Sequence, residues 1–423
     1  MKRVLIILTM IFFIGCEEDP TMYTLTVSSN PTEGGTINPT SGEYQEGTEV
    51  TLRVNTNTNY EFDRWSGSWS GTESPLTITM DSNKTLVGNF NFLDSDGDGV
   101  GDDDDLDNNT RSGVPVDENG VMLNPIYLDE NGVTIKSREW GIVGDTGEVN
   151  GVEYTIGDRS YVGIWLGEDR NLNQLCTSLI TDMSELFRNS DFDGDISFWD
   201  VSNVTNMEIM FWNSSFNGDV SNWDVSNVTN MRGLFSTSQF NGDISDWDVS
   251  SVRNMGGIFV RSQFNGDISN WDVSNVTDMN SMFYRSQFNG DLSSWDVSSV
   301  TNMEVMFEGS VFNGDISNWD VSNVVNMSRM FNGSEFNQDI SNWDVSNVTN
   351  MSIMFSESPF NQDISTWDVS NVVNMFVMFS NSNQFNQDLS NWDVSNVIDC
   401  SSFSYITPQW TLPKPNFTNC NPN

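Results

Sequence analysis

Carboxylates are the side chains of this sequence that could do chemistry. The 423 residues include 60 Asp and Glu against 17 Lys and Arg, a net charge of −43, and no histidine. Without histidine, Ser-His-Asp and Cys-His nucleophiles and histidine-ligated metal sites are excluded. Two kinds of carboxylate chemistry remain: binding of hard cations, calcium above all, and glycoside hydrolysis by a pair of acids. The same charge repels nucleic acid and anionic lipid over a Debye length of about 10 Å, so neither is an expected partner.

The densest run of carboxylates, DSDGDGVGDDDDLD, begins at residue 94. Counted from its first residue, acids stand at positions 1, 3, 5, 9 and 12, and Gly99 stands at position 6, where a calcium loop turns sharply. A backbone carbonyl at position 7 would add a further oxygen ligand. The sequence therefore predicts a calcium site whose ligands are Asp94, Asp96, Asp98, Val100, Asp102 and Asp105.

This loop resembles a thrombospondin type 3 repeat. An EF-hand would have Glu at position 12 between two amphipathic helices, whereas Asp105 stands here and no such helices flank it. The following TRSGVPVDENG resembles the segment that trails such repeats in bacterial surface proteins. We interpret residues 93–120 as a calcium-binding linker that stiffens when loaded; the alternative is a solvated acidic linker.

Further carboxylates recur with a strict period. Tryptophan returns every 24 residues and once after 25, at 199, 223, 247, 271, 295, 319, 343, 367 and 392. Two aspartates accompany each tryptophan and form two ladders, one from Asp195 to Asp388 and one from Asp200 to Asp393. Asp accepts backbone N–H bonds two residues on, so turn formation is the expected role of both ladders. Bound cations are a weaker alternative, and nine identical pairs give no unique catalytic site.

The period also predicts the fold of these residues. Val204, Met207, Met210 and Phe211 are spaced like one face of a short helix, and Trp199 and Val201 alternate like a short strand. One copy has too few apolar side chains to fold alone, so stacking must bury them in a continuous core. We expect an α/β repeat solenoid of 24-residue leucine-rich-like coils, each with one short strand and one short helix, preceded by a small all-β domain.

The pattern FNxDISxWDVSNVTNMxxMFxxS, present in nine copies over residues 183–403, resembles the BspA-type leucine-rich-like repeats of bacterial surface lipoproteins. The ends of such a stack need caps, which we expect at 121–182 and 404–423. Asn-Gly pairs at Asn131 and Asn150 predict hairpins in the first cap. Cys400 replaces the usual Met, and a disulfide between Cys400 and Cys420 would hold the second cap; Cys176 would be left over, although pairing cannot be fixed from sequence.

Residues 23–92 alternate apolar and polar side chains between turn signals and predict a small all-β domain. GGTINPTSGEYQEGTEVTL followed by YEFDRWSG resembles the divergent InlB B-type repeat of bacterial surface proteins, which implies a spacer. We expect Trp65 and Trp69 to pack in the core or a turn; glycan binding is the alternative.

The N-terminus reads as a processing signal. Lys2 and Arg3 precede an apolar run that ends in Phe13-Ile14-Gly15-Cys16, which resembles a bacterial lipobox. The resemblance implies removal of residues 1–15, lipidation of Cys16 and a lipidated tether at 16–22, with the membrane as a partner through the anchor alone. Glu17-Glu18-Asp19 looks like the acidic export tag of Bacteroidetes-type surface lipoproteins, which implies an outer membrane lipoprotein exposed at the cell surface.

Positions that vary between copies are those that the fold does not fix, and they follow the Met-Phe pair. Aromatic residues and arginines collect there, while no lysine occurs between Lys136 and Lys414. The candidate ligand-binding residues are Trp212, Arg232, Val260, Arg261, Tyr284 and Arg285. We expect a non-enzymatic surface protein for adhesion or recognition of a protein or glycan ligand. The alternatives are a structural cell-envelope protein, a carboxylate-dependent glycoside hydrolase and a polysaccharide-binding protein.

Overall fold

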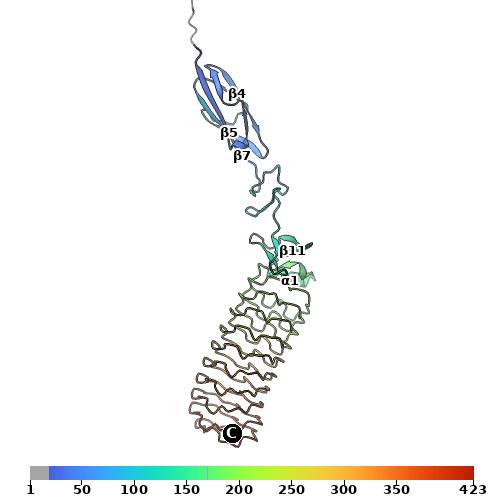
Figure 1. The fold of residues 1–423 in the computed structure, drawn as a ribbon, viewed down its shortest axis with the longest axis vertical. Coiled ribbons are helices and arrows are strands. Elements are labelled where there is room, and N and C mark those ends of the chain that lie inside the picture. Colours follow the sequence, from blue (N-terminus) through green and yellow to red (C-terminus); the bar gives the residue numbers. More distant parts are fainter. Residues whose placement is uncertain (1–18, 169) are drawn as a thin grey trace, which may run out of the picture. The chain divides into compact units, whose positions relative to one another are not determined.

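The computed structural model describes residues 19–168 and 170–423 and divides into two compact units at Leu123 and Asn124 (Figure 1). The lipobox and Cys16 lie outside the described residues. Among the residues that are described, no helix combines the length and the apolar character needed to cross a lipid bilayer.

The first unit begins with an all-β domain of two small sheets. One sheet has the strand order β3-β1-β7-β5, in which β1 and β7 run parallel, and the other has the order β2-β4-β6. Alternate side chains of these strands, among them Leu25, Leu52 and Leu86, are fully buried between the sheets. The elements are β1 (Met22–Asn30), η1 (Thr32–Gly34), β2 (Gly35–Asn38), β3 (Gly42–Gln45), β4 (Glu49–Thr56), β5 (Tyr60–Gly67), β6 (Leu76–Thr79) and β7 (Lys84–Phe92).

Trp65 belongs to the core of this domain. Its side chain is fully buried, its ring packs edge-on against Phe62 at 5.3 Å, and its indole N–H donates to the carbonyl of Glu73 at 2.8 Å. Trp69 is half-buried and packs against the same core. The expected packing role of Trp65 is confirmed.

The second unit opens with a cap made of two hairpins and a short helix. The expected hairpins are present, β8 with β9 and β10 with β11, and Asn150 and Gly151 both have the positive φ that a tight hairpin turn requires. Asp158 begins the helix by accepting the N–H groups of Ser160 and Tyr161. The elements are β8 (Ile126–Leu128), β9 (Ile135–Ser137), β10 (Thr146–Val149), β11 (Val152–Ile156), α1 (Arg159–Gly167), η2 (Leu172–Gln174) and β12 (Leu175–Cys176).

The repeats form coils stacked one on another, as Figure 1 shows below α1. Parallel bridges join the same position of successive coils, from Asp182 and Asn206 to Asn374 and Asp399. The phenylalanine and tryptophan rings stack on their equivalents in the neighbouring coil; the rings of Trp343 and Trp367, for example, lie 6.4 Å apart. The apolar positions of all nine coils join one buried cluster, so the expected continuous core is confirmed.

The predicted short helix in each coil is wrong. Ile209 donates its N–H to the carbonyl of Arg232 in the next coil (2.8 Å), whereas Met210 donates to Met207 in its own coil (3.2 Å), and this alternation continues along the segment. Ile209 also has a φ of 49°, outside the right-handed helical region. Since every second N–H bonds to the neighbouring coil, the four-residue bonding of an α-helix cannot form.

The predicted short strand in each coil is also wrong. Trp199 makes one isolated bridge to Ile135 of the cap, and Val204 closes a turn by donating its N–H to the carbonyl of Val201 at 2.9 Å. The coils at 183–403, all of which the structure describes, consist of turns and single bridges. The apolar spacing predicted the core residues correctly, but their backbone forms turns rather than the expected helix and strand.

The two ends of the stack are closed differently. At the first coil, Arg159 donates to the backbone carbonyls of Asp182 (3.3 Å) and Ser184, which have no preceding coil to accept from. At the last coil, the C-terminal tail imitates a further coil: Thr411 donates its N–H to Asn386 Oδ1 at 2.8 Å, the bond that Asn386 itself makes to the coil before it. Trp410 covers the end of the core.

Candidate functional site

The loop predicted to bind calcium brings three of its expected ligands together. Carboxylate oxygens of Asp94, Asp96 and Asp98 all lie within 4.8 Å of one another. Asp94 accepts the N–H groups of Gly97 (2.7 Å) and Gly99 (2.9 Å), and both glycines have positive φ, so the chain wraps around this carboxylate. Glycine is favoured at both positions because a side chain would be strained there.

One buried oxygen of this cluster lacks a partner. Asp98 Oδ2 is buried and accepts no hydrogen bond from any described residue, whereas Oδ1 accepts the N–H of Val100 at 2.8 Å. The N–H of Asp107 lowers the pKa of Asp105, but burial and the charges of Asp98 and Asp96 outweigh it and raise that pKa above its usual value. Asp105 therefore feels the cluster's negative field. A hard cation would relieve both features, and an all-oxygen donor set is the kind that calcium prefers.

Two further predicted ligands, Asp102 and Val100, form hydrogen bonds within the loop. Both oxygens of Asp102 are engaged by Ser95, one by its N–H at 2.7 Å and one by its hydroxyl at 2.9 Å. Val100 donates its N–H to Asp98 Oδ1 rather than offering its carbonyl to the cluster among the described contacts. The loop thus gathers Asp94, Asp96 and Asp98, with Asp105 close enough to sense them.

Asn59, which the sequence did not single out, docks this loop on the β domain. Its side chain accepts the N–H of Asp103 at 2.8 Å and donates to Asp104 Oδ2 at 2.6 Å. It is nearly buried, has a positive φ, and would be struck by any Cβ at Gly101. Asn59 belongs to no recognisable sequence motif. Its position in a turn between two expected strands is the one sequence signal that could have identified it.

Both aspartate ladders form turns. In all nine coils, each ladder aspartate accepts the backbone N–H of the serine two residues on, for example Asp267 from Ser269 at 2.9 Å and Asp272 from Ser274 at 3.1 Å. The N–H of Ser269 lowers the pKa of Asp267 below its usual value, and Ser250 does the same to the pKa of Asp248. The predicted turn role is therefore confirmed, and these carboxylates are occupied by their own turns.

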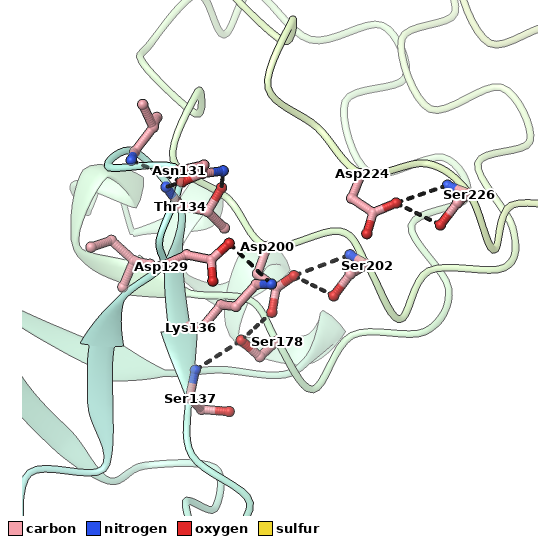
Figure 2. A network of polar contacts seen from close by, with 12 residues as sticks. Asp129, Asn131, Thr134, Lys136, Ser137, Ser178, Asp200, Ser202, Asp224 and Ser226 are labelled. Atoms are coloured by element: carbon pink, nitrogen blue, oxygen red, sulfur yellow. Dashed lines mark hydrogen bonds and ion pairs between the residues drawn. The ribbon is translucent and has the colours of Figure 1, made fainter. Parts of the chain in front are cut away.

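The first aspartate of the second ladder is buried where the cap meets the coils (Figure 2). Asp200 accepts the hydroxyls of Ser202 (2.6 Å) and Ser178 (2.5 Å), whereas Asp224, one coil on, is exposed and accepts only from Ser226. Figure 2 shows Asp200 facing β9, from which Ser137 donates its N–H to Ser178 at 2.9 Å.

Lys136 offsets the negative charge at this junction. Its ammonium pairs with Asp129 at 3.3 Å. Burial lowers the pKa of Lys136, but the charges of Asp200 and Asp129 outweigh it and raise that pKa above its usual value. The network satisfies buried polar groups between cap and coil, which identifies it as structural.

The candidate ligand residues form two groups on the stack. In the first, Arg188 lies over the Trp212 ring at 5.1 Å, and Arg232 pairs with Glu208 at 3.0 Å. Arg188, Trp212 and Arg232 border a groove of about 310 Å³ together with Val260. The full lining is Arg188, Ile209, Trp212, Arg232, Gly233, Ser236, Gly256, Gly257, Val260, Asn280 and Ser281.

The second group surrounds one tyrosine. The guanidinium groups of Arg261 and Arg285 lie 5.6 and 5.2 Å from the centre of the Tyr284 ring. Both arginines have positive φ, near 50°; Arg285 directly follows Tyr284, and Arg261 holds the equivalent position in the preceding coil. Cation–π contact of this kind holds an aromatic side chain at the surface in a fixed orientation.

The groove exists because side chains are missing from two adjacent coils. Gly256 and Gly257 stand where the preceding coil has Arg232 and Gly233 and the following one has Asn280 and Ser281. The sequence prediction named aromatic and arginine side chains and did not include these glycines. A comparison of equivalent positions in the nine copies would have identified them.

The remaining predicted residues are the cysteines. Cys400 and Cys420 are joined by a disulfide that ties the C-terminal tail to the last coil. Cys176 is a free, buried thiol, and burial raises its pKa to about 11, so it is not a reactive nucleophile at neutral pH. The lipidation prediction at Cys16 lies outside the described residues.

Comparison with known families bears on both units. The family described as "Mycoplasma protein of unknown function, DUF285" matches residues 161–263, 215–313, 236–335 and 309–410, which together exceed half of the chain. The chain belongs to this family. The DUF285 matches cover the end of the cap, all nine coils and the beginning of the C-terminal tail. In this chain, the family's repeated sequence therefore folds into the stacked coils described above.

The first unit has a match of its own. The divergent InlB B-repeat domain matches residues 24–92, the two-sheet domain that contains Trp65. Together, the two matches support a repeat-containing protein of the surface type. Neither a curated protein nor a solved structure matches the chain.

Proposed function

We propose that this chain is a non-enzymatic bacterial surface protein that recognises a protein or glycan ligand through one face of its coils. One observation carries the proposal. Residues that recur in every coil are buried in the core or occupied in turns, whereas the groove and the Tyr284 cluster are built largely from positions whose residues differ between coils. Aromatic and arginine side chains are enriched at recognition surfaces.

The occupied carboxylates argue against a glycoside hydrolase. A hydrolase needs one acid with a raised pKa beside a second, ionised acid. The ladder aspartates instead accept hydrogen bonds in repeating turns, and where their pKa is shifted it is lowered, as at Asp291 and Asp344. Lowered values suit permanent anions rather than proton donors.

The closed ends of the stack argue against a self-assembling coat protein. Head-to-tail joining would require the first coil to offer its backbone carbonyls to the last coil of another copy. Arg159 already occupies the carbonyls of Asp182 and Ser184, and the tail residue Trp410 covers the other end.

The first unit would display the coils away from the membrane. We propose that Cys16 carries the lipid anchor at the outer membrane, with the β domain as a spacer. Asp94, Asp96 and Asp98 would hold calcium, with Asp105 beside them. When bound, calcium would supply the positive charge that cross-links this segment. Asn59 would then fix the loop against the β domain, because its side chain forms hydrogen bonds with both Asp103 and Asp104.

The test is a binding screen of the full chain, with calcium, against a glycan array and a panel of extracellular matrix proteins. We expect a ligand whose binding falls at least tenfold in the double variant Y284A/R285A. The matched control is S356A/E357A, which changes the equivalent positions three coils away. Hydrolysis of a polysaccharide by the chain, or self-assembly without any ligand, would overturn the proposal in favour of the enzyme or the coat protein.

A further inference from the structure

The backbone groups that line the groove beside Trp212 are already hydrogen-bonded, so they are not free to pair with a bound peptide. Gly233 donates its N–H to the carbonyl of Gly256 (2.8 Å), and Gly257 donates to that of Asn280 (2.7 Å). The N–H of Gly256 is taken by Asn254 Oδ1 at 2.9 Å. An extended peptide binds by pairing its backbone with free backbone groups, and these are already paired between coils.

What the groove offers is side-chain hydrogen bonding on an apolar wall. Ser236, Asn280 and Ser281 line it with two hydroxyls and an amide. Asn280 Oδ1 accepts the hydroxyl of Ser281 at 2.9 Å, and among the described residues its amide N–H groups donate no hydrogen bond. The indole of Trp212 and the methyl groups of Val260 form the apolar part. A ring with hydroxyls on its edge and C–H groups on its face matches this lining.

Two ion-paired arginines lie at the rim of the groove. Arg188 and Arg232 each bond one glutamate through Nη1, at 2.7 and 3.0 Å, and their side chains remain 42% and 59% exposed. A guanidinium has five N–H donors, so most of them remain available to a second carboxylate. The chain's net charge of −43 would repel an anion at long range, but physiological salt screens this beyond about 8 Å.

We propose that this groove binds one acidic sugar residue, a pyranose that carries a carboxylate, as in hexuronic and sialic acids. The ring lies against Trp212 and Val260, its hydroxyls meet Ser236 and Asn280, and its carboxylate meets Arg232. The groove volume of about 310 Å³ is at the lower end of the range for small-ligand sites, which suits one sugar ring. This inference rests on the proposed recognition function and names its ligand class.

A variant that fills the groove without disturbing the scaffold is available from the chain itself. Gly257 has a φ of 66°, and the same position in other coils carries Ile209 (49°) and Ile353 (60°), so the backbone accepts isoleucine there. A Cβ at Gly257 would lie 3.3 Å from a methyl carbon of Val260, which places the new side chain inside the groove. Val305→Ile changes the same position two coils away and is the matched control.

The experiment titrates the full chain with methyl β-glucuronide, a methyl sialoside and neutral methyl β-glucoside, by calorimetry and ligand-observed NMR. We expect one acidic glycoside to bind at least tenfold more tightly than the glucoside. We expect Gly257→Ile and Arg232→Gln each to weaken it at least tenfold, while Val305→Ile and Arg329→Gln bind as the natural chain does. Arg232→Gln alters only an exposed ion pair, so it tests the site even if the glycine variant unfolds.

Two outcomes would overturn the inference. One is that the natural chain binds neither acidic glycoside; the other is that folded Gly257→Ile binds it unchanged. If the chain binds a protein or a neutral glycan in the wider screen but no acidic glycoside, the recognition function stands and the acidic-sugar site fails.

Discussion

The indole N–H of Trp271 donates to the backbone carbonyl of Ile244, 3.0 Å away in the preceding coil. The same bond joins each tryptophan from 223 to 392 to the coil before it. Trp199 is the exception, because its N–H is buried without a partner among the described residues.

We therefore predict that Trp271→Phe destabilises the coils by about 2 to 3 kcal/mol, since it removes a buried hydrogen bond between coils together with packed atoms. Trp199→Phe should cost clearly less, because it loses no hydrogen bond. Urea unfolding followed by circular dichroism measures both. Equal costs for the two variants would show that the hydrogen bond contributes nothing beyond packing.

Calcium should protect the linker at residues 93–120 from protease. With chelator, the carboxylates of Asp94, Asp96 and Asp98 repel one another at short range and the loop opens. Limited proteolysis with mass spectrometry should show cleavage there at least tenfold faster in chelator than in calcium.

The matched variants are Asp98→Asn and Asp103→Asn. The first removes the charge of the unpartnered oxygen and should abolish the calcium protection, whereas the second lies outside the three-carboxylate cluster and should keep it. Cleavage at the same rate with calcium and with chelator in the natural chain would contradict the site.

Acid should lower the stability of the coils within a narrow pH range, close to the pKa of the ladder aspartates. The ladder carboxyls Asp243, Asp267, Asp291 and Asp315 have a lowered pKa in the folded chain because serine N–H and hydroxyl groups bond the charged form. Their contribution is complete above the unfolded value of about 3.9 and is lost as the pH falls through the lower folded values.

The urea midpoint should thus stay level between pH 7 and pH 5 and fall by pH 3. Asp267→Asn keeps an acceptor oxygen for the N–H of Ser269 but lacks the charge, so its midpoint should lie below that of the natural chain at pH 7 and approach it at pH 3. A midpoint that rises in acid would mean that repulsion along the ladder dominates over the turn bonds.

The disulfide should stabilise the end of the stack. Cys400 and Cys420 are 20 residues apart, a loop for which cross-linking contributes about 3 kcal/mol in the chain-entropy account. The variant Cys400→Met with Cys420→Ser restores the side chain usual at that position of the repeat, so its lower stability would report the missing cross-link rather than a cavity.

Thiol counting provides a separate check. With Cys16 lipidated as proposed, the mature protein should show one free thiol, Cys176, when denatured without reductant. Three free thiols would contradict the cross-link.

The sequence located the core and the turns but not the backbone between them. Met207 and Phe211 were correctly expected inside, and Asp267 correctly expected in a turn, because burial and Asx turns depend on side-chain type and spacing. The helix at Met207 was wrong because apolar residues three and four apart also fit a run of turns whose alternate N–H groups bond to the next coil. Only the neighbouring coil decides between these, and single-copy spacing carries no information about it.

The candidate site was predictable in part for a similar reason. Trp212, Arg232 and Val260 were found from their variation between copies, and all three border the groove. The groove itself depends on Gly233, Gly256 and Gly257, residues that attract no attention as chemistry. Asp98 was found from loop spacing, whereas Asn59 was not, because its two bonds span 44 and 45 residues.

The junctions between coils are interchangeable, and this bears on how such a chain changes over generations. Each junction repeats the same hydrogen bonds and stacked rings, while Arg159 and Trp410 close the two ends. Recombination that gains or loses 24 residues in register would leave every scaffold contact in place. Length can thus drift freely among descendants, whereas the groove is inherited only when the coils bearing Gly233 and Gly257 stay neighbours.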